Sequence, residues 1–451
     1  MEIRRVGGPI RGLMMSGVEG GGGGGPISRF NKMTIRDLAG QLAGKRVLVR
    51  VDFNVSDPKT GEIKSDTRIK AALPTINFLR GQGAVVILAS HNERPKDLIK
   101  SLMAEGMDKT TARRVTFQRL SLKKAAWRLG ELMRDKVLLL TSISPEDPIN
   151  PDILPWVSCL APGSVSMLEN TRFYEGDEKG DMELARKIVD STGAQIFVMD
   201  GFSAAHRGHA SVTGVAKVIQ ERGGVAVAGD LLQKEIEYLG KKLIESPARP
   251  YVALMGGAKV ADKMKIIDNL LENVDALVIG GAMIYPFLRA KSEKMGVDPL
   301  GRSEAEIAGD IEAARRILTG PHYEKIILPY RLVMADNRIK DVDPTELISL
   351  LLSRINGRYG TPGTIVWNGP FGQVEVAPYD RGTTALLGYI SGQNQQGAVT
   401  ITGGGDTEKA IKVAMKAGVD VRFSHISTGG GAMLELLEGK ELPGIAVLNN
   451  R

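Results

Sequence analysis

Residues 46–55, RVLVRVDFNV, decide the fold. The run from Arg46 to Val51 is apolar and rich in valine, and Asp52 and Asn54 follow at its end, which indicates a buried strand of a parallel sheet. We expect similar strands at 84–89, 164–168 and 195–199, with helices such as 122–134 and 182–191 between them. This alternation predicts a parallel sheet with helices on both faces.

A second series of strands begins after Pro250, with members expected at 251–255, 276–279, 325–328, 364–367, 398–402 and 421–425. Between the two series, apolar residues at helical spacing predict a joining helix over 230–244. The fold class is therefore α/β, with two doubly wound parallel-sheet, Rossmann-like domains joined by a hinge helix. The expected segments are an N-terminal domain at 33–228, an interdomain helix at 229–245, a C-terminal domain at 246–432 and a C-terminal tail at 433–451.

Residues 1–32 differ in composition from the rest, with six glycines at 20–25 and little apolar periodicity. They are expected to be a disordered extension. Four arginines are compatible with an organelle transit peptide, but Glu2 and Glu19 and a low serine content favour a flexible tail, with Met33 as the working start. Cys159 is the single cysteine, so a reducing compartment is expected: the cytoplasm, or an organelle if the extension is a targeting peptide.

The composition excludes several classes of protein. With 43% apolar residues in 451, the chain can form two or three packed domains. Its longest strongly apolar uncharged run, 276–288, is too short to cross a bilayer, so no membrane partner is expected. The net charge of +7 is spread over single bases and pairs rather than a basic tract, which argues against nucleic acid and favours small anionic ligands.

Cations follow each predicted strand of the first half. These residues are Arg68, His91, Arg94, Arg172, His206, Arg207 and His209. In parallel sheets, ligands bind beyond the carboxyl ends of the strands, and arginine binds carboxylates and phosphates through two parallel hydrogen bonds. The first domain is therefore predicted to bind a carboxylate or phosphate.

Glycine-rich turns follow the predicted strands of the second half. They are Gly256-Gly257-Ala258-Lys259, Gly280-Gly281, Asn368-Gly369-Pro370, Gly403-Gly404-Gly405-Asp406-Thr407 and Gly429-Gly430-Gly431. Glycine lets backbone N–H groups approach a phosphate, so five such turns predict a nucleotide site. The sequence contains no P-loop, no dinucleotide fingerprint, no HExxH or CxxC spacing and no GxSxG motif.

Asp406 could cap the following helix, but within a phosphate-binding turn a carboxylate is better explained by Mg²⁺ bridging it to the phosphates. Lys259 and Lys263 lie one helical turn apart and are expected to neutralise phosphate oxygens. An anion domain, a nucleotide domain and a hinge together imply phosphoryl transfer between two separately bound substrates. Domain closure would expel water.

From about Met33 to Arg451, the chain resembles the phosphoglycerate kinase family. The matching motifs are RVDFNV (50–55), RIKAALPTI (68–76), LENTRF (168–173), AAHRGHAS (204–211), GGAKVADK (256–263), WNGPFGQVE (367–375), GGGDT (403–407) and STGGGAMLELLEGKELPG (427–444). The resemblance implies an enzyme that reversibly transfers a phosphoryl group between 1,3-bisphosphoglycerate and ADP, giving 3-phosphoglycerate and ATP. It also implies a hinge-bending monomer whose C-terminal tail packs on the first domain.

The resemblance assigns roles to particular residues. It places 3-phosphoglycerate on Asp52, Asn54, Arg68, His91, Arg94, Arg172 and Arg207. It places the nucleotide on Lys259, Lys263, Gly280, Asn368, Glu375, Gly404, Gly405, Asp406 and Thr407, with Asp406 on magnesium. Arg68, Lys259, Gly404 and Gly405 would surround the phosphoryl group in transit.

Four positions depart from the family pattern. Glu93 and Ser203 stand where the family has glycine, Ala282 replaces the third glycine after Gly280, and Asp343 replaces the glycine of an Asp-x-Gly-Pro motif. Glu93 would bring a negative charge into the anion site. An alternative interpretation is therefore a catalytically weakened member of the family that is retained for binding or regulation.

Overall fold

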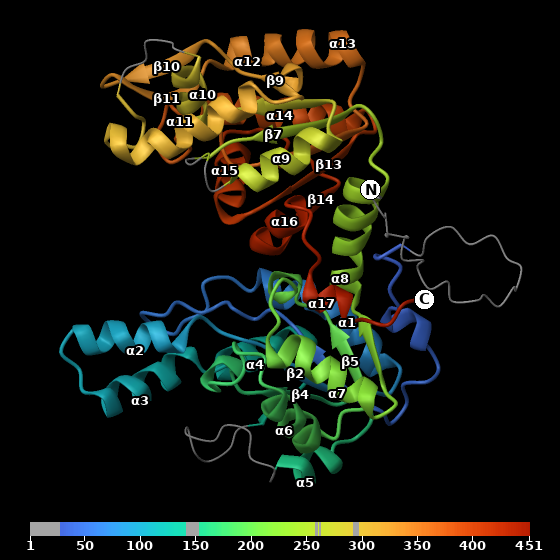
Figure 1. The fold of residues 1–451 in the computed structure, drawn as a ribbon. Helices are drawn as coiled ribbons and strands as arrows, with labels where there is room; N and C mark the ends of the chain where they lie inside the picture. Colours follow the sequence, from blue (N-terminus) through green and yellow to red (C-terminus); the bar gives the residue numbers. More distant parts are fainter. Residues whose placement is uncertain (1–27, 141–152, 258–259, 261–262, 292–296) are drawn as a thin grey trace, which may run out of the picture.

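Two parallel sheets, one in each domain, form the centre of the protein in this computed structural model (Figure 1). The structure describes residues 28–140, 153–257, 260, 263–291 and 297–451. The predicted α/β class with two doubly wound domains is confirmed. In the described part of the chain, no helix is long and apolar enough to cross a membrane.

The N-terminal sheet has the strand order β3-β4-β2-β1-β5-β6, and all its pairs are parallel. Its strands are β1 (Arg46–Arg50), β2 (Val85–Ala89), β3 (Val137–Leu140), β4 (Val165–Leu168), β5 (Ile196–Met199) and β6 (Val225–Ala228). The helices around it are α1 (Thr67–Gly81), α2 (Pro95–Ala104), α3 (Lys109–Leu120), α4 (Lys123–Met133), α5 (Ile153–Ser158), α6 (Met182–Thr192) and α7 (Val215–Glu221). Shorter turns are η1 (Ile35–Leu38), η2 (Thr171–Phe173), η3 (Phe202–Ala204) and η4 (Ala210–Gly214).

The C-terminal sheet has the order β14-β13-β12-β7-β8-β9, again all parallel. Its strands are β7 (Tyr251–Met255), β8 (Ala276–Ile279), β9 (Ile326–Ile327), β12 (Thr364–Asn368), β13 (Val399–Gly403) and β14 (His425–Ser427). The main helices are α9 (Met264–Asn273), α10 (Ile284–Ala290), α11 (Glu304–Leu318), α12 (Pro344–Leu351), α13 (Gly357–Tyr359), α14 (Arg381–Gln395) and α15 (Gly405–Lys416). An antiparallel hairpin, β10 (Leu332–Ala335) and β11 (Arg338–Val342), lies outside this sheet.

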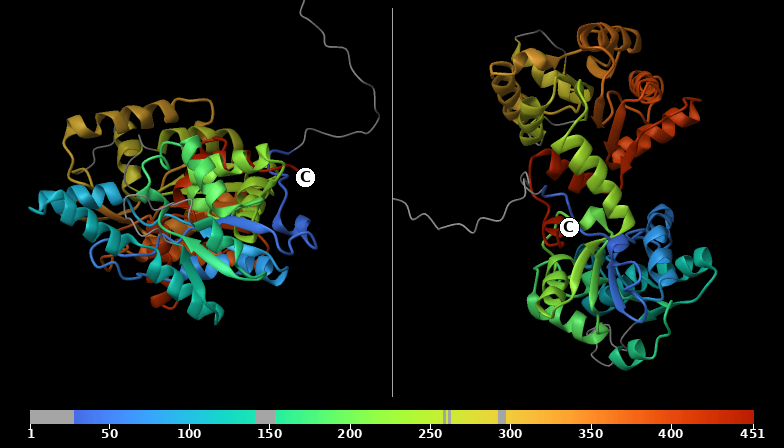
Figure 2. Two further views of the ribbon diagram at one scale, coloured as in Figure 1. Left: turned by 90° about the horizontal axis from the view of Figure 1, so that it is seen from below. Right: turned by 90° about the vertical axis from the view of Figure 1, so that its right-hand side faces the viewer.

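The two domains are joined twice. The first connection is α8 (Asp230–Glu235), which continues without a break as η5 (Ile236–Glu245). The second is the end of the chain, where α16 (Gly430–Leu437) leads to α17 (Pro443–Ala446) on the N-terminal domain (Figure 2). There Gly444 N–H donates to the Ala205 carbonyl at 2.8 Å and Asn449 N–H to the Ala226 carbonyl at 2.9 Å. The C-terminal residues therefore complete the first domain.

Some elements differ from the sequence prediction. Strands β3 and β6 and the β10–β11 hairpin were not expected, and the last strand lies at His425–Ser427 rather than 421–425. Val421 and Phe423 instead pack against the core of the C-terminal domain as part of a loop. The expected disordered extension also reaches too far, because Phe30 is only 3% exposed and Lys32 Nζ donates to the Leu448 carbonyl at 3.1 Å. Residues 1–27 lie outside the described residues.

Candidate active site

Each sheet reverses its winding direction at one point, and both halves of the candidate site lie there. In the N-terminal sheet the reversal falls between β1 and β5, which are neighbours. In the C-terminal sheet it falls between β7 and β12. The crevice beyond the carboxyl ends of the strands at such a point is where open α/β sheets bind ligands.

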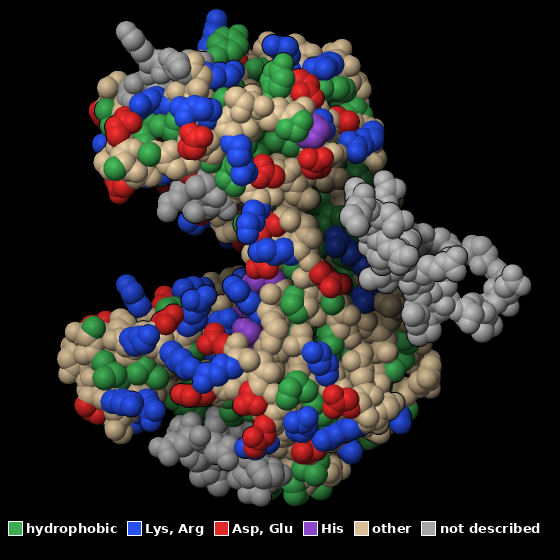
Figure 3. Space-filling model, in the orientation of Figure 1, with side chains coloured by type: hydrophobic (Ala, Val, Ile, Leu, Met, Phe, Trp, Pro, Cys, Tyr) green, Lys and Arg blue, Asp and Glu red, His purple; other side chains and the backbone are tan. Residues whose placement is uncertain are grey.

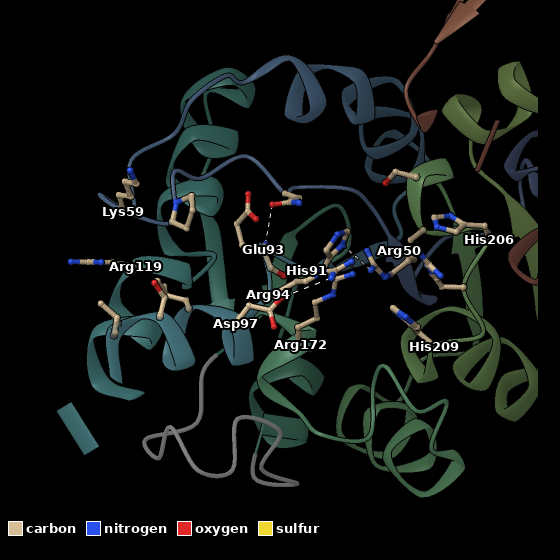
Figure 4. A pocket seen from close by; sticks show the side chains of 18 of the residues that line it. Arg50, Lys59, His91, Glu93, Arg94, Asp97, Arg119, Arg172, His206 and His209 are labelled. Carbon is tan, nitrogen blue, oxygen red and sulfur yellow. Dashed lines mark hydrogen bonds and ion pairs between the residues drawn. The ribbon is translucent and has the colours of Figure 1, made fainter. Parts of the chain in front are cut away.

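A cavity of about 780 Å³ opens beyond the N-terminal sheet, and Lys and Arg side chains gather around the cleft between the domains (Figure 3). The basic residues that line it are Arg50, Lys59, His91, Arg94, Arg119, Arg172, His206, Arg207 and His209. Figure 4 shows Arg50, His91, Arg94 and Arg172 close together, with Lys59 and Arg119 at the far end. Asn54 also lines the cavity, so five of the seven residues predicted to bind 3-phosphoglycerate do so.

The other two predicted residues, Arg68 and Asp52, form an ion pair. Arg68 Nη1 lies 2.9 Å from Asp52 Oδ2 and donates to the Asn54 carbonyl at 3.2 Å. The Arg68 side chain is 41% exposed and the Asp52 side chain 10% exposed. Arg68 comes from the first turn of α1, and Asp52 from the end of β1. The structure thus brings together residues that lie 16 positions apart.

His91 is neutral because of its surroundings. Burial, and then the charge of Arg50, hold the pKa of His91 well below its usual range. Arg50 Nη2 lies 3.1 Å from His91 Nδ1, and an arginine can only donate. His91 Nδ1 must therefore accept, which leaves Nε2–H as a donor. Burial likewise lowers the pKa of His209 to about 4, so neither ring adds charge near pH 7.

Glu93 adopts a left-handed backbone conformation at the edge of this cavity. Its φ is +51°, a value that glycine adopts more easily than any other residue. Asn54 Oδ1 accepts from Glu93 N–H at 2.9 Å, and Arg172 Nη1 donates to the Glu93 carbonyl at 2.8 Å. The partly exposed carboxylate lines the cavity, and no ion pair with another described residue engages it.

Lys263 connects the ends of the neighbouring strands β7 and β12 in the C-terminal domain. Its Nζ donates to the Gly256 carbonyl at 2.7 Å and to Asn368 Oδ1 at 2.9 Å. Burial lowers the pKa of Lys263 to about 8, and the charge of Asp406 opposes that shift. Lys263, Asn368 and Asp406 therefore lie near one another. Lys259 lies outside the described residues.

The glycine turn after β13 begins α15. Gly404 has a φ of +109°, and Gly369 N–H donates to Thr407 Oγ1 at 3.2 Å, which ties this turn to the end of β12. Asp406 is the second residue of the helix and makes no capping hydrogen bond, so the capping alternative does not hold. Its carboxylate is 77% exposed and lies 3.3 Å from Lys409 Nζ.

The remaining predicted nucleotide residues lie around the same strand ends. Gly280 follows β8, and a Cβ there would lie 2.3 Å from the Phe371 ring, so only glycine fits. Glu375 is exposed in the turn after β12. Ala282 lies within the short turn η7 (Gly281–Met283), where it is accommodated. Asp343 accepts from Glu346 N–H at 2.8 Å and caps the N-terminus of α12.

The sequence analysis missed two residues of the N-terminal half. Arg50 is fully buried, and a basic residue inside an apolar strand gives no signal of a site beyond its own charge. Ser203 was noted only as a departure from a pattern, but its hydroxyl donates to Asp52 Oδ2. That contact depends on the adjacency of β1 and β5, which the sequence does not state.

A basic cavity on one domain and a lysine-bearing glycine site on the other define a two-domain phosphotransferase of the kinase class. Comparison with known proteins identifies the family: the family model "Phosphoglycerate kinase" matches residues 35–440. A phosphoglycerate kinase of Thermosynechococcus vestitus is 40% identical over 436 residues, covering 93% of this chain and all of the relative. One of Gloeobacter violaceus is 41% identical, covering 93% and 99%. The chain belongs to the phosphoglycerate kinase family.

Solved structures agree with this assignment. The phosphoglycerate kinase structure from Coxiella burnetii is 31% identical and superposes with a TM-score of 0.72, covering 92% of this chain and 98% of that one. The crystal structure of the enzyme from Pyrococcus horikoshii is 27% identical, with the same TM-score of 0.72. The family consists of phosphotransferases with a carboxyl group as acceptor.

Proposed function

We propose that this protein catalyses reversible phosphoryl transfer between 1,3-bisphosphoglycerate and ADP, giving 3-phosphoglycerate and ATP. The observation that carries the proposal is the contact between the two half-sites. A Cβ on Gly429 would lie 2.9 Å from Ser203 Cα, and one on Gly430 would lie 2.8 Å from Gly404 Cα. Consecutive residues thus contact the anion cavity on one side and the glycine turn of the nucleotide site on the other.

The N-terminal cavity suits 3-phosphoglycerate by its charge. Arg68, Arg94, Arg172 and Arg207 would bind the phosphate and carboxylate. Asp52 would accept a hydrogen bond from the substrate hydroxyl. Asn54 would donate one to the substrate carboxylate. His91, held neutral with its Nε2–H as a donor, would add a hydrogen bond without adding charge.

The C-terminal site suits ATP or ADP. Lys259, Lys263 and Asn368 would meet the phosphates, together with the backbone N–H groups of the turn from Gly404 to Thr407. Gly280 would allow the base to approach, and Glu375 would hold the ribose hydroxyls. Arg68 and Lys259 would flank the phosphoryl group in transit, with Gly404 and Gly405 facing its oxygens.

Asp406 fits a role in holding Mg²⁺ with the nucleotide. No group of three or more acidic, histidine or cysteine side chains in the described ranges could hold a metal alone. Mg²⁺ commonly binds through one or two carboxylates together with substrate phosphates, and the exposed Asp406 carboxylate beside the glycine turn meets that requirement. When bound, the ion would neutralise phosphate charge. Closure of the domains about the interdomain helix would exclude water. The protein would act as a monomer in the cytoplasm, or in an organelle if the N-terminal extension, residues 1–32, is a targeting peptide.

A coupled assay in the ATP-forming direction tests the proposal. We expect turnover that EDTA abolishes and added Mg²⁺ restores. Asp406→Asn should raise the Mg²⁺ concentration needed for half-maximal rate, whereas Glu408→Gln, a matched change two residues further along α15, should not. A folded protein that binds 3-phosphoglycerate but shows no turnover at millimolar substrates would favour the alternative of a weakened family member, for which Glu93 is the supporting feature.

A further inference from the structure

We infer that Ser203 is a positioning residue: its hydroxyl holds the Asp52 carboxylate in the orientation that keeps Arg68 at the end of β1, beside the active-site cavity. The inference rests on the roles proposed above for Asp52 and Arg68. Ser203 itself lines the cavity, but its described hydroxyl bond goes to Asp52 rather than into the open space.

The hydrogen bonds of Asp52 show why the serine matters. Oδ1 accepts from Asn54 N–H at 3.1 Å and from Arg68 Nη1 at 3.1 Å. Oδ2 accepts from Ser203 Oγ and lies 2.9 Å from Arg68 Nη1. Arg68 therefore lies against both oxygens of a carboxylate whose rotation is fixed by one backbone donor and one hydroxyl.

Water is a poor substitute for the serine hydroxyl at this place, because the Asp52 side chain is only 10% exposed. Without Ser203, Oδ2 keeps the arginine as its one described partner, and the Asn54 N–H is the only described donor besides Arg68 that still orients the carboxylate. A hydrogen bond to a charged group contributes more to stability than a hydrogen bond between neutral groups. Loss of this bond would let Arg68, whose side chain is 41% exposed, move toward solvent.

The serine is held rigidly, so it can orient another group. Phe202 is buried, and a Cβ on Gly201 would lie 3.2 Å from Asp52 N, so the backbone before Ser203 lies directly against the end of β1. On the other side, Gly429 approaches the Ser203 backbone. Ser203 caps no helix: the N-cap of the short turn η3 is Gly201, and that turn has no side-chain capping bond. Its hydroxyl is thus available to Asp52.

The test compares wild type, Ser203→Ala, Arg68→Ala and the double variant in steady-state kinetics, with melting curves and calorimetric binding of 3-phosphoglycerate. Ser203→Ala should lower kcat/KM for 3-phosphoglycerate about tenfold through both constants, leaving KM for ATP within twofold and the melting temperature unchanged. In the Arg68→Ala background, the same change should have less than a twofold effect, because the group that Ser203 positions is absent.

If Ser203→Ala lowers kcat/KM by the same factor in wild type and in Arg68→Ala, the inference is overturned, because Ser203 then acts independently of Arg68. An unchanged kcat/KM in Ser203→Ala would also overturn it. A lower kcat and melting temperature with KM for both substrates as in wild type would show a purely structural defect and would likewise overturn it. If wild type shows no turnover, the proposed function fails, and the calorimetric affinity of Ser203→Ala for 3-phosphoglycerate, expected to be weaker, still decides the positioning role.

Discussion

Replacing Glu93 with glycine should improve both substrate binding and stability. The backbone of Glu93 has a φ of +51°, which costs a non-glycine residue roughly 1–2 kcal/mol relative to right-handed backbone. Glycine removes that strain. Its greater freedom in the unfolded chain, however, lowers the stability of the fold by about 0.4–1 kcal/mol. We therefore expect Glu93→Gly to stabilise the N-terminal domain by about 0.5–1 kcal/mol.

The charge of Glu93 acts on the ligand. Its carboxylate lines the same cavity as Arg94 and Arg172. At about 8 Å from a bound phosphate, with an effective dielectric constant near 40 for a partly exposed group, the repulsion is roughly 1 kcal/mol. Its removal should lower KM for 3-phosphoglycerate about fivefold and leave KM for ATP unchanged.

Two further variants separate strain from charge. Glu93→Gln removes the charge but keeps the side chain at positive φ, so KM for 3-phosphoglycerate should fall as in Glu93→Gly without the gain in stability. Glu221→Gln makes the same charge change at an exposed position outside this cavity and should alter neither KM nor stability. Kinetics at low ionic strength, where screening is weak, and urea denaturation measure both effects. A higher KM for 3-phosphoglycerate in both Glu93 variants would refute the reasoning and show that the carboxylate helps to bind substrate.

Three other predictions follow from the site and the fold. Arg68→Ala should lower kcat by about 10²–10³-fold with little change in melting temperature, because a partly exposed ion pair contributes little stability. Lys70→Ala on the same helix is the control, and a large loss of stability with normal activity per folded molecule would contradict the proposed role of Arg68. KM for ATP should rise as the pH increases through about 8, where Lys263 loses its proton. Lys263→Arg keeps the positive charge at this pH, so the same rise in that variant would show that Lys263 is not its cause. Deleting residues 1–27 should change neither activity nor melting, whereas deleting 1–32 should destabilise the protein by about 1.5–3 kcal/mol through loss of the buried Phe30 ring; equal melting of the two truncated proteins would refute this.

The sequence predicted those features that a short window contains. Strands β7 and β8 lie where their apolar runs place them, since a run bounded by polar residues and glycines has one good interpretation. The last strand was misplaced because Val421 and Phe423 have the apolar alternation of a strand but pack as a loop, with Phe423 stacked on Trp367 at 6.1 Å. Apolar alternation indicates burial, and burial does not require strand pairing.

The site was predicted as a set of residues and not as a geometry. Arginines and glycines after strands could be recognised one strand at a time, because every strand of a parallel sheet ends at the same edge. The pairs Ser203–Asp52 and Arg50–His91 join different strands, so they depend on which strands are neighbours. Strand order comes from the packing of the whole domain, and no local pattern specifies it.

The return of the chain end to the first domain has a consequence for synthesis on the ribosome. Asn449 N–H donates to the carbonyl of Ala226 in strand β6, and Lys32 pairs with Asn450 next to it. At about 5–20 residues per second, the ribosome reaches residue 449 roughly 10–45 s after it has passed the end of β6. During that interval the nascent N-terminal domain lacks its last layer of contacts. The N-terminal domain therefore gains these contacts only after the C-terminal domain has been synthesised.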